Sequence, residues 1–418
     1  MEFNQQNNKI LFVVTSFPSV TETFIINQIA DLIDRGFQVT VFAYNKNKID
    51  IQHKIYKDYQ LEKCTFFHFK NEKSIIKIVF YWLSFFFEHL FKINYKLILS
   101  CFNPFQFSTG VSKIKALYDL PIFMLNQHFD IIHCHFGFNG KKISKLSSLG
   151  IIKHSKLVLS FHGSDLTPSR IQEYKTLYKP IFECFNAYTI NTLFLKEIVL
   201  KINPKLKNLF ILPVGFKEEY LKSYLNSPKN EQLFPVIFIG RFIELKGPLQ
   251  AIKIVESLYL KGIKNCCLHM VGDGELKEEL QSYVRQNKLE KIVFFHGQMG
   301  QEDVFKLLAS SAVFLLPGIT DLESGRAETQ GLVIQEAQYL KVPVVVSDVG
   351  GIKYGLLNNS SGFLINSTDI PTFAAKIEQL YFDKELRKTV GENGHYFVKE
   401  NYTSKKLGDQ LIKIYAGL

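Results

Sequence analysis

Short hydrophobic runs alternate along most of this chain with segments in which apolar residues recur every three or four positions. The runs have the length of buried strands, and the spaced segments have the period of amphipathic helices. This alternation predicts parallel α/β sheets. The predicted strands of the first half are KILFVV, FQVTVFAY, FDIIHCHF, KLVLSFHG, AYTIN and NLFILPVG. Those of the second half are PVIFIGR, CCLHMVGDG, KIVFFHGQ, AVFLLPG, VPVVVSD and SGFLI.

A polar break, SYLNSPKNEQ at 223–232, separates the two series of strands and is typical of a linker. A chain of 418 residues is also too long for one ordinary core. We therefore expect two α/β domains, at 1–222 and 233–395, followed by a helical C-terminal segment at 396–418. Two such sheets would leave a cleft between their carboxyl edges, where ligands of these sheets usually bind.

The stretch AETQGLVIQEA places two acids around the start of a predicted helix. Apolar positions recur at helical spacing from Leu332 to Leu340, so Glu328 precedes the helix and Glu336 lies about a turn inside it. The N–H groups of a helix N-terminus attract phosphate. This arrangement suits a site for a phosphorylated sugar, and the alternative is a solvated surface acid followed by a half-buried helical one.

Basic and imidazole side chains follow other predicted strands. Arg241 and Lys246 lie between a strand and a helix, where they suit phosphate oxygens or are ordinary surface charges. His162 follows KLVLSF, at a strand end that faces the expected cleft. His133 and His135 have the spacing of a metal pair, but no further ligand is arranged nearby, so we expect no metal site.

Other functions are disfavoured by composition and spacing. After Gly272-Asp273-Gly274, Lys277 stands where the dinucleotide fingerprint needs a third glycine, which argues against an NAD enzyme. The net charge of +11 favours an anionic partner, such as a nucleotide or an acidic membrane surface. Nucleic acid ranks last, because no basic run with interleaved aromatic residues is present. The 6 scattered cysteines fit a reducing, cytoplasmic setting.

The stretch SIIKIVFYWLSFFFEHLF at 74–91 is apolar enough to raise the question of a membrane. Lys77 and Glu88 interrupt it, and charges near a bilayer centre are costly. Its aromatic residues and neighbouring lysines favour a helix that lies on an anionic membrane surface, with residues 74–102 in contact. A pair of core helices is the alternative.

Seven motifs follow one another along the chain: SFPSVTETFI, HCHFG, SFHGSD, GRFIELKGP, VGDGEL, FHGQM and AETQGLVIQEAQYLKVPVVVSDVGGI. In these motifs and in their order, the chain resembles the retaining nucleotide-sugar glycosyltransferases of family 4 over nearly its whole length. The resemblance implies the GT-B fold, with an acceptor-binding first domain, a donor-binding second domain and a C-terminal helix that packs back on the first. The opening motif is similar to that of the branch that builds exopolysaccharides and other surface glycans.

The resemblance assigns roles to individual residues. Arg241 and Lys246 would hold the donor pyrophosphate and Glu336 the ribose, while Glu328 and His162 would face the donor sugar. The catalytic group is thus Glu328, His162, Arg241 and Lys246. The remaining donor-side residues are Gly331 and Leu332 near the phosphates, Gly297 and Gln298 near the base, and Gly272. The acceptor side would include Thr21, Glu22 and His135, although a helix cap explains Thr21 and Glu22 equally well.

The implied reaction moves a sugar from a nucleoside diphosphate to a glycan or lipid-linked glycan, with no cofactor or metal. The departing phosphate would take the acceptor proton. Tyr354 stands where the family usually has an acid, and no glycine-rich loop follows the first strand. The alternatives are a nucleotide-sugar epimerase or a phosphorylase of the same fold, and a non-catalytic scaffold that only binds a nucleotide sugar.

Overall fold

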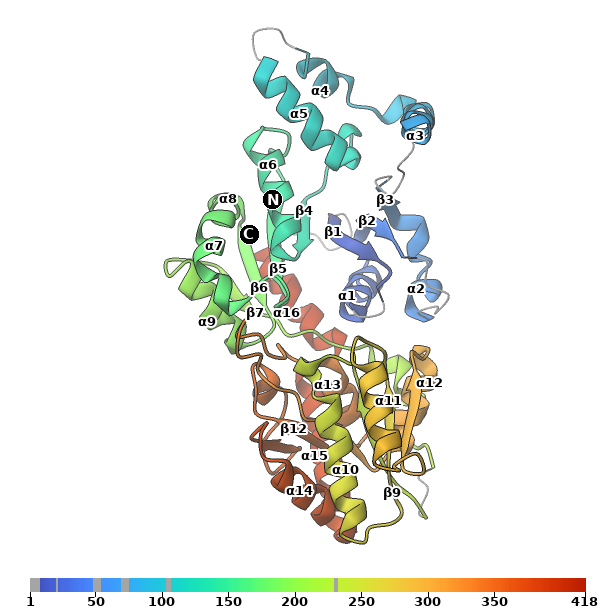
Figure 1. Ribbon diagram of the computed structural model, residues 1–418. Helices are drawn as coiled ribbons and strands as arrows, with labels where there is room; N and C mark the ends of the chain where they lie inside the picture. Colours follow the sequence, from blue (N-terminus) through green and yellow to red (C-terminus); the bar gives the residue numbers. More distant parts are fainter. Residues whose placement is uncertain (1–7, 20–21, 48–53, 69–74, 103–106, 229–231) are drawn as a thin grey trace.

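A computed structural model describes residues 8–19, 22–47, 54–68, 75–102, 107–228 and 232–418. Figure 1 shows two α/β halves, one above the other, with α3, α4 and α5 at the far end of the upper half. Each half contains one parallel sheet. The two predicted α/β units with parallel sheets are therefore confirmed.

The sheet of the first half has the strand order β3-β2-β1-β4-β5-β6-β7, which is the order of a doubly wound nucleotide-binding fold. All six predicted strands are present, and the three-residue strand β3 is an additional one that the hydrophobic pattern did not predict. Alternate residues of β1 enter different cores: Leu11 and Val13 face one side, Ile10 and Phe12 the other. The strands are β1 Lys9–Phe17, β2 Gln38–Lys46, β3 Thr65–Phe67, β4 Ile131–His135, β5 Lys156–Phe161, β6 Ala187–Ile190 and β7 Leu209–Ile211.

Helices cover both faces of this sheet and extend beyond its edge (Figure 1). They are α1 Thr23–Asp34, α2 Lys54–Asp58, α3 Ile75–Glu88, α4 Tyr95–Ser100, α5 Phe107–Asp119, α6 Gly137–Ser148, α7 Ile171–Leu177, α8 Lys179–Cys184 and α9 Leu193–Ile202. Helix α1 ends at Asp34, and Gly36, two residues later, lies in the left-handed region at φ 88°, as is common just after a helix. Its N-cap position is Glu22, whose side chain makes no capping hydrogen bond.

The second half repeats the same strand order, β10-β9-β8-β11-β12-β13, around one large core. Its strands are β8 Phe234–Ile239, β9 Cys266–Val271, β10 Val293–Gly297, β11 Val313–Leu316, β12 Val344–Ser347 and β13 Phe363–Ile365. Its helices are α10 Pro248–Leu260, α11 Lys277–Gln286, α12 Gln301–Ser310, α13 Leu332–Tyr339, α14 Ile370–Phe382 and α15 Lys384–Asn401.

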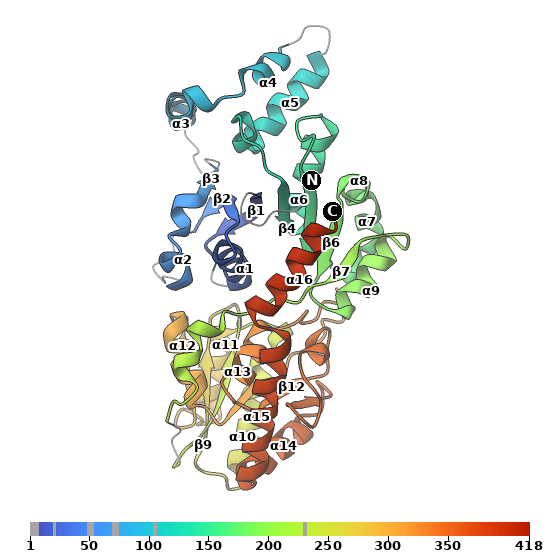
Figure 2. The ribbon, with the colours of Figure 1, turned by 180° about the vertical axis from the view of Figure 1, so that it is seen from behind.

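The chain crosses twice between the halves, and the crossings lie side by side. Phe216 in the first crossing pairs with Thr403 in the second, and the Ser404 N–H donates to the Phe216 carbonyl oxygen at 2.8 Å. Helix α16, Ser404–Ala416, follows the second crossing and packs on α1 of the first half (Figure 2). Arg35 fastens this contact, because its guanidinium bonds both the Asp409 carboxylate and the Lys405 carbonyl oxygen at 2.7 Å.

Helix α3 is packed along one face only. Phe85 is 3% exposed and lies in a small core with Ile93 and Leu117. By contrast, Phe87 is 83% exposed and Phe91, just beyond the helix, is 97% exposed. Helix α3 thus has one packed face and one exposed face, and contact with a membrane stays a prediction. Within the described residues, no helix is both long and apolar enough to cross a membrane.

Candidate active site

Lys246 and Glu328 form an ion pair where the two predicted basic and acidic loops of the second half meet. The Lys246 Nζ donates to the Glu328 Oε2, and 18% and 12% of the two side chains are exposed. Burial alone would raise the pKa of Glu328, but the Lys246 ammonium and the backbone N–H groups of Thr329 and Gln330 hold it below its usual value. Glu328 is therefore a carboxylate at neutral pH, fixed against a cation.

Helix α13 begins four residues after this acid, at Leu332, as predicted. Gly331 is its N-cap in the left-handed region at φ 76°, a conformation that suits glycine, and Leu332 is its first residue. Glu336 lies one turn inside and is 8% exposed, and burial raises the pKa of its carboxyl group to about 7. No hydrogen bond or ion pair joins this carboxyl group to the part of the chain that the structure describes. It is a buried acceptor with free capacity beside a helix N-terminus.

Arg241 follows β8 at the same edge of the sheet and is exposed. Within the described residues its guanidinium makes no ion pair. The structure thus brings one paired cation, Lys246, and one unpaired cation, Arg241, to the loops next to Glu328. Two such groups fit the oxygens of a diphosphate.

The predicted glycines differ in what they do. Gly272 has a φ of 140°, and a Cβ at this position would lie 1.9 Å from the Gly240 carbonyl oxygen. The absence of a side chain therefore lets the two loops approach each other closely. Gly297 ends β10, and its carbonyl oxygen accepts from the Gly272 N–H at 2.9 Å. A Cβ there would meet no atom within 4 Å. Gln298, next to it, is exposed. Gly297 and Gln298 therefore lie on an open edge of the second half.

His162 lies at the end of β5 in the first half and is held by two neighbours. Its Nε2 is 2.8 Å from the Nδ1 of His135, and its Nδ1 is 3.2 Å from the Oδ1 of Asn191. Burial lowers the pKa of His162 to about 3, against the opposing effect of the Asn191 hydrogen bond. His162 is therefore a neutral imidazole with a fixed orientation.

Asp165 shapes the loop that carries His162, and the sequence reasoning missed it. Its Oδ1 accepts from the N–H groups of His162 and Gly163 at 3.1 and 3.0 Å. Its Oδ2 accepts from the Gly137 N–H at 2.7 Å. The signal was present in SFHGSD, because a short Asp side chain in a turn often hydrogen-bonds to neighbouring backbone N–H groups.

The predicted acceptor-side residues are not gathered around one group. His135 is 1% exposed and lies behind His162, so its contact is with that imidazole. Glu22 has one buried oxygen without a partner, and burial raises its pKa to about 7. Thr21 lies outside the described residues.

The third histidine, His133, is fully used inside the fold. Its Nδ1 is 2.6 Å from the hydroxyl of Tyr415 on α16, and its Nε2 is 2.7 Å from the Ser160 Oγ. Both ring nitrogens are occupied, so the spacing of His133 and His135 serves packing. Where the structure describes the chain, no three His, Cys, Asp or Glu side chains gather as metal ligands.

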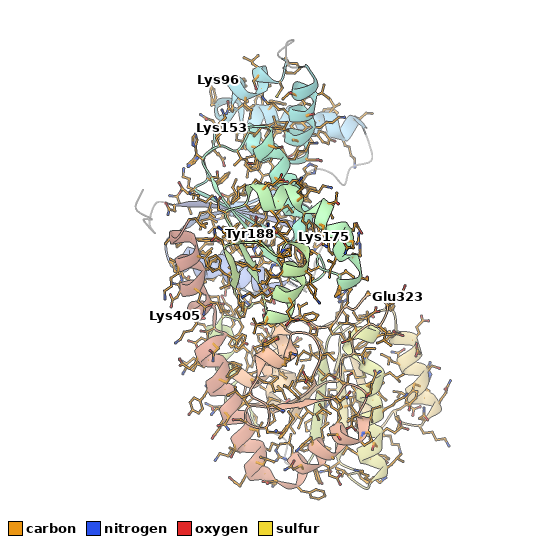
Figure 3. The ribbon with its side chains drawn as sticks, turned by 90° about the vertical axis from the view of Figure 1, so that its left-hand side faces the viewer. Lys96, Lys153, Lys175, Tyr188, Glu323 and Lys405 are labelled. Atoms are coloured by element: carbon orange, nitrogen blue, oxygen red, sulfur yellow. The ribbon has the colours of Figure 1, made fainter. Side chains whose placement is uncertain are left out.

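Thr329 and Gln330, which follow Glu328, reach across to the first half. The Thr329 Oγ1 donates to the His162 carbonyl oxygen at 3.1 Å, and the Gln330 amide makes two hydrogen bonds to Val214. The 318–326 loop also touches the first half, where the Ser169 N–H donates to the Ser324 carbonyl oxygen at 3.0 Å. Figure 3 shows Glu323 of this loop at the level where the halves meet. Sequence reasoning did not identify these contacts.

Comparison with known proteins gives one family match and many relatives. Residues 223–396 match the family described as "Glycosyl transferases group 1". The amylovoran biosynthesis glycosyltransferase AmsK of Erwinia amylovora is 25% identical over 382 residues, which cover 89% of this chain and 90% of that protein. The UDP-Gal:alpha-D-GlcNAc-diphosphoundecaprenol alpha-1,3-galactosyltransferase of Escherichia coli is 26% identical over 66% of this chain and 72% of its own length.

Solved structures give the fold. HepE of Anabaena, in complex with UDP-glucose, matches 99% of this chain and 100% of its own with a TM-score of 0.70 at 15% identity. At that identity the match concerns architecture alone. The two sheets form the GT-B fold, which confirms the expected fold, and the second half contains a glycosyl transferases group 1 domain.

Proposed function

We propose that this chain is a retaining glycosyltransferase that moves a sugar from a nucleoside diphosphate to a glycan or lipid-linked glycan. The observation that carries the proposal is the Lys246–Glu328 pair at the N-terminal end of α13, with unpaired Arg241 and buried Glu336 nearby. Cations, a helix N-terminus and a free buried acceptor supply complementary groups for a diphosphate and a ribose. The relatives in amylovoran and diphosphoundecaprenol-linked glycan synthesis favour this reaction class.

In the proposed reaction, the bond between the sugar C1 and the phosphate oxygen breaks, and a bond from the acceptor oxygen to C1 forms on the same face. The acceptor proton passes to the departing phosphate. Arg241 and Lys246 stabilise the charge that grows on that phosphate. Glu328 lies beside the sugar and fixes Lys246, while Glu336 accepts from the ribose hydroxyls. These two cations take the place of a metal ion, so EDTA should leave turnover unchanged.

His162 contributes a neutral imidazole ring in a fixed position to the proposed site. An imidazole with a pKa of about 3 does not add a positive charge near neutral pH. Both of its ring nitrogens are hydrogen-bonded, to His135 at 2.8 Å and to Asn191 at 3.2 Å, so the imidazole acts through the fixed position of its ring. We assign it to the orientation of the donor sugar.

We also propose that the outer face of α3 and the following turns rests on an anionic membrane, where a lipid-linked acceptor would be found. Phe80 and Leu83 on α3 are 68% and 62% exposed, and Phe91 is 97% exposed. Between 75 and 119 the described residues include five lysines, Lys77, Lys92, Lys96, Lys113 and Lys115, against Glu88 and Asp119. An apolar face with an excess of positive charge fits an interfacial helix. All six cysteines are free, which fits a reducing compartment such as the cytoplasm.

The membrane contact is tested with liposomes. Replacing Phe80, Phe87 and Phe91 by Ser should abolish sedimentation with vesicles that contain phosphatidylglycerol and leave the melting temperature unchanged. Phe85→Ser is the matched control, because that side chain is packed and its loss should lower the melting temperature. Equal binding of the triple variant and the wild type would overturn the membrane proposal.

The reaction is tested by nucleotide release from UDP- and GDP-sugars, with and without an acceptor lipid extract. Transfer requires release that depends on the acceptor, and NMR of the product should show the donor's anomeric configuration. An epimerase would instead change the sugar without any acceptor. A scaffold would bind one donor sugar with equal affinity in the wild type and in Glu328→Ala, and neither protein would turn that donor over. This outcome would overturn the proposal.

A further inference from the structure

Three consecutive residues connect the predicted donor site with both halves of the molecule. Glu328 pairs with Lys246 in the second half. The side chains of Thr329 and Gln330 both make hydrogen bonds to backbone groups of the first half. The loop that carries the acid is thus fixed from two sides, and one of these sides belongs to the other α/β unit.

Gln330 is hydrogen-bonded to Val214, in the chain segment that crosses between the halves. Its Oε1 accepts from the Val214 N–H at 2.8 Å, and its Nε2 donates to the Val214 carbonyl oxygen at 2.7 Å. A single side-chain amide therefore satisfies both backbone groups of one residue, as a neighbouring strand would. Gln330 is 1% exposed, and its Nε2 also lies 3.3 Å from the Oε1 of Gln335 on α13. Breaking this contact would leave buried polar groups without partners.

Thr329 is fitted between glycines. A Cβ on Gly163 would lie 2.2 Å from the Thr329 Cγ2, and one on Gly351 would lie 1.8 Å from the Thr329 carbonyl oxygen. That oxygen accepts from the Thr192 Oγ1 at 3.0 Å. The Thr329 hydroxyl donates to the carbonyl oxygen of His162, whose imidazole is the first half's candidate group in the site.

We propose that Gln330 and Thr329 are positioning residues, which place Glu328 and His162 relative to each other only while the two halves are in contact. The inference rests on the proposed function, since it concerns the same donor site. The groups proposed to hold the nucleotide, Arg241, Lys246 and Glu336, all belong to the second half. The cross-contacts of the Glu328 loop belong to the first. Separation of the halves would leave the nucleotide contacts intact and release the loop.

This arrangement predicts that binding and turnover respond differently. In Gln330→Leu, the affinity for UDP or GDP should stay within about twofold of the wild type, while kcat falls about tenfold. Small-angle X-ray scattering should give a larger radius of gyration, because the amide no longer joins the halves. The matched control is Gln338→Leu, since Gln338 is also buried and donates to the Gly355 carbonyl oxygen within the second half. The control should lower the melting temperature with little effect on kcat or compactness.

A second pair of variants covers the case in which Gln330→Leu does not fold. Thr329→Val keeps the methyl group but loses the donor to His162, so kcat should fall, whereas Thr329→Ser keeps the hydroxyl and should retain most of it. Two outcomes would overturn the inference. One is a parallel loss of nucleotide affinity and kcat. The other is that kcat and compactness stay unchanged in both Gln330→Leu and Thr329→Val. If the wild type transfers no sugar, the proposed function fails, and the scattering comparison still decides whether these residues join the halves.

Discussion

The two sides of the candidate site differ in charge. The second half presents the Lys246–Glu328 ion pair and the exposed guanidinium of Arg241. The first half presents His162, whose pKa burial lowers to about 3, backed by His135, whose pKa burial also lowers well below the usual value. The second half therefore carries an ion pair and an exposed cation, whereas the two histidines of the first half are neutral at the pH of a cell.

This difference separates two tasks. In the proposed reaction, the growing phosphate charge would be stabilised by cations that are already in place in the second half. The first half would place a neutral imidazole of fixed orientation beside the sugar, which does not compete for the phosphate. Removal of a charged group should therefore cost more activity than removal of a neutral one.

The largest loss is expected from Lys246→Ala. Removal of a nearly buried cation beside the leaving phosphate should lower kcat roughly 10³-fold, at the upper end of what one stabilising group contributes. It should also lower the melting temperature, because Glu328 is left as a buried carboxylate without its partner. Nucleotide release and thermal unfolding measure the two effects.

The double variant Lys246→Ala/Glu328→Ala separates catalysis from stability. It should recover most of the melting temperature, since no unpaired charge remains, yet stay as slow as the single variant. Lys277→Ala is the surface control, because Lys277 pairs with Asp273 at 3.0 Å and both side chains are more than one third exposed. Recovery of activity in the double variant would contradict a direct role for Lys246.

Arg241→Ala should have the next largest effect, a fall in kcat of roughly 10²-fold. The guanidinium is exposed, so added salt screens it more than it screens Lys246. The wild-type rate should therefore fall as NaCl is raised, and the rate of Arg241→Ala should respond less. Arg285→Ala, which removes an exposed arginine of α11, should match the wild type in both rate and salt response.

Glu336→Gln should show a smaller effect that depends on pH. Burial raises the pKa of Glu336 from its usual 4.5 to about 7 in the folded protein. Its contribution to stability is therefore fully present below about pH 4.5 and is lost as pH rises through about 7. The shift corresponds to about 3 kcal/mol.

Urea unfolding of the wild type and Glu336→Gln at several pH values measures this effect. The unfolding free energy of Glu336→Gln should not fall as pH rises through about 7, so at alkaline pH it should exceed that of the wild type. Its nucleotide affinity should be weaker, since an amide oxygen is a poorer acceptor for ribose hydroxyls than a carboxylate. Glu278→Gln, at an exposed position on α11, should behave as the wild type. Identical pH profiles of the unfolding free energy for Glu336→Gln and the wild type would contradict a raised pKa for Glu336.

Sequence patterns predicted the ionic side better than the neutral one. Strand ends and helix starts lie where hydrophobic periodicity changes, so the neighbourhoods of Arg241, Lys246, Glu328 and the start of α13 could be located from local signals. The same signals predicted all the strands except β3. They left open whether 74–91 forms a surface helix or core helices, and the packed Phe85 and exposed Phe87 show that α3 has one face of each kind.

The contacts that order the site could not be predicted, because they join residues far apart in the chain. Thr192 binds Thr329 and Gln330 binds Val214 across separations of 137 and 116 residues. His133 and Tyr415 are separated by 282 residues. No periodicity encodes such pairs. The neutrality of His162 also depends on burial, which follows only once both halves and α16 are in place.

The smallest effect is expected from the titration of His162. With a pKa of about 3, this imidazole stays neutral from about pH 5.5 to about pH 8, so its contribution should not change over that range. The ratio of kcat/KM for the wild type to that for His162→Ala should therefore be constant across it. A ratio that changes with an apparent pKa near 6.5 would mean that the imidazole becomes charged when substrate is bound. The first half would then also place a positive charge in the site, and the two sides would no longer differ in charge.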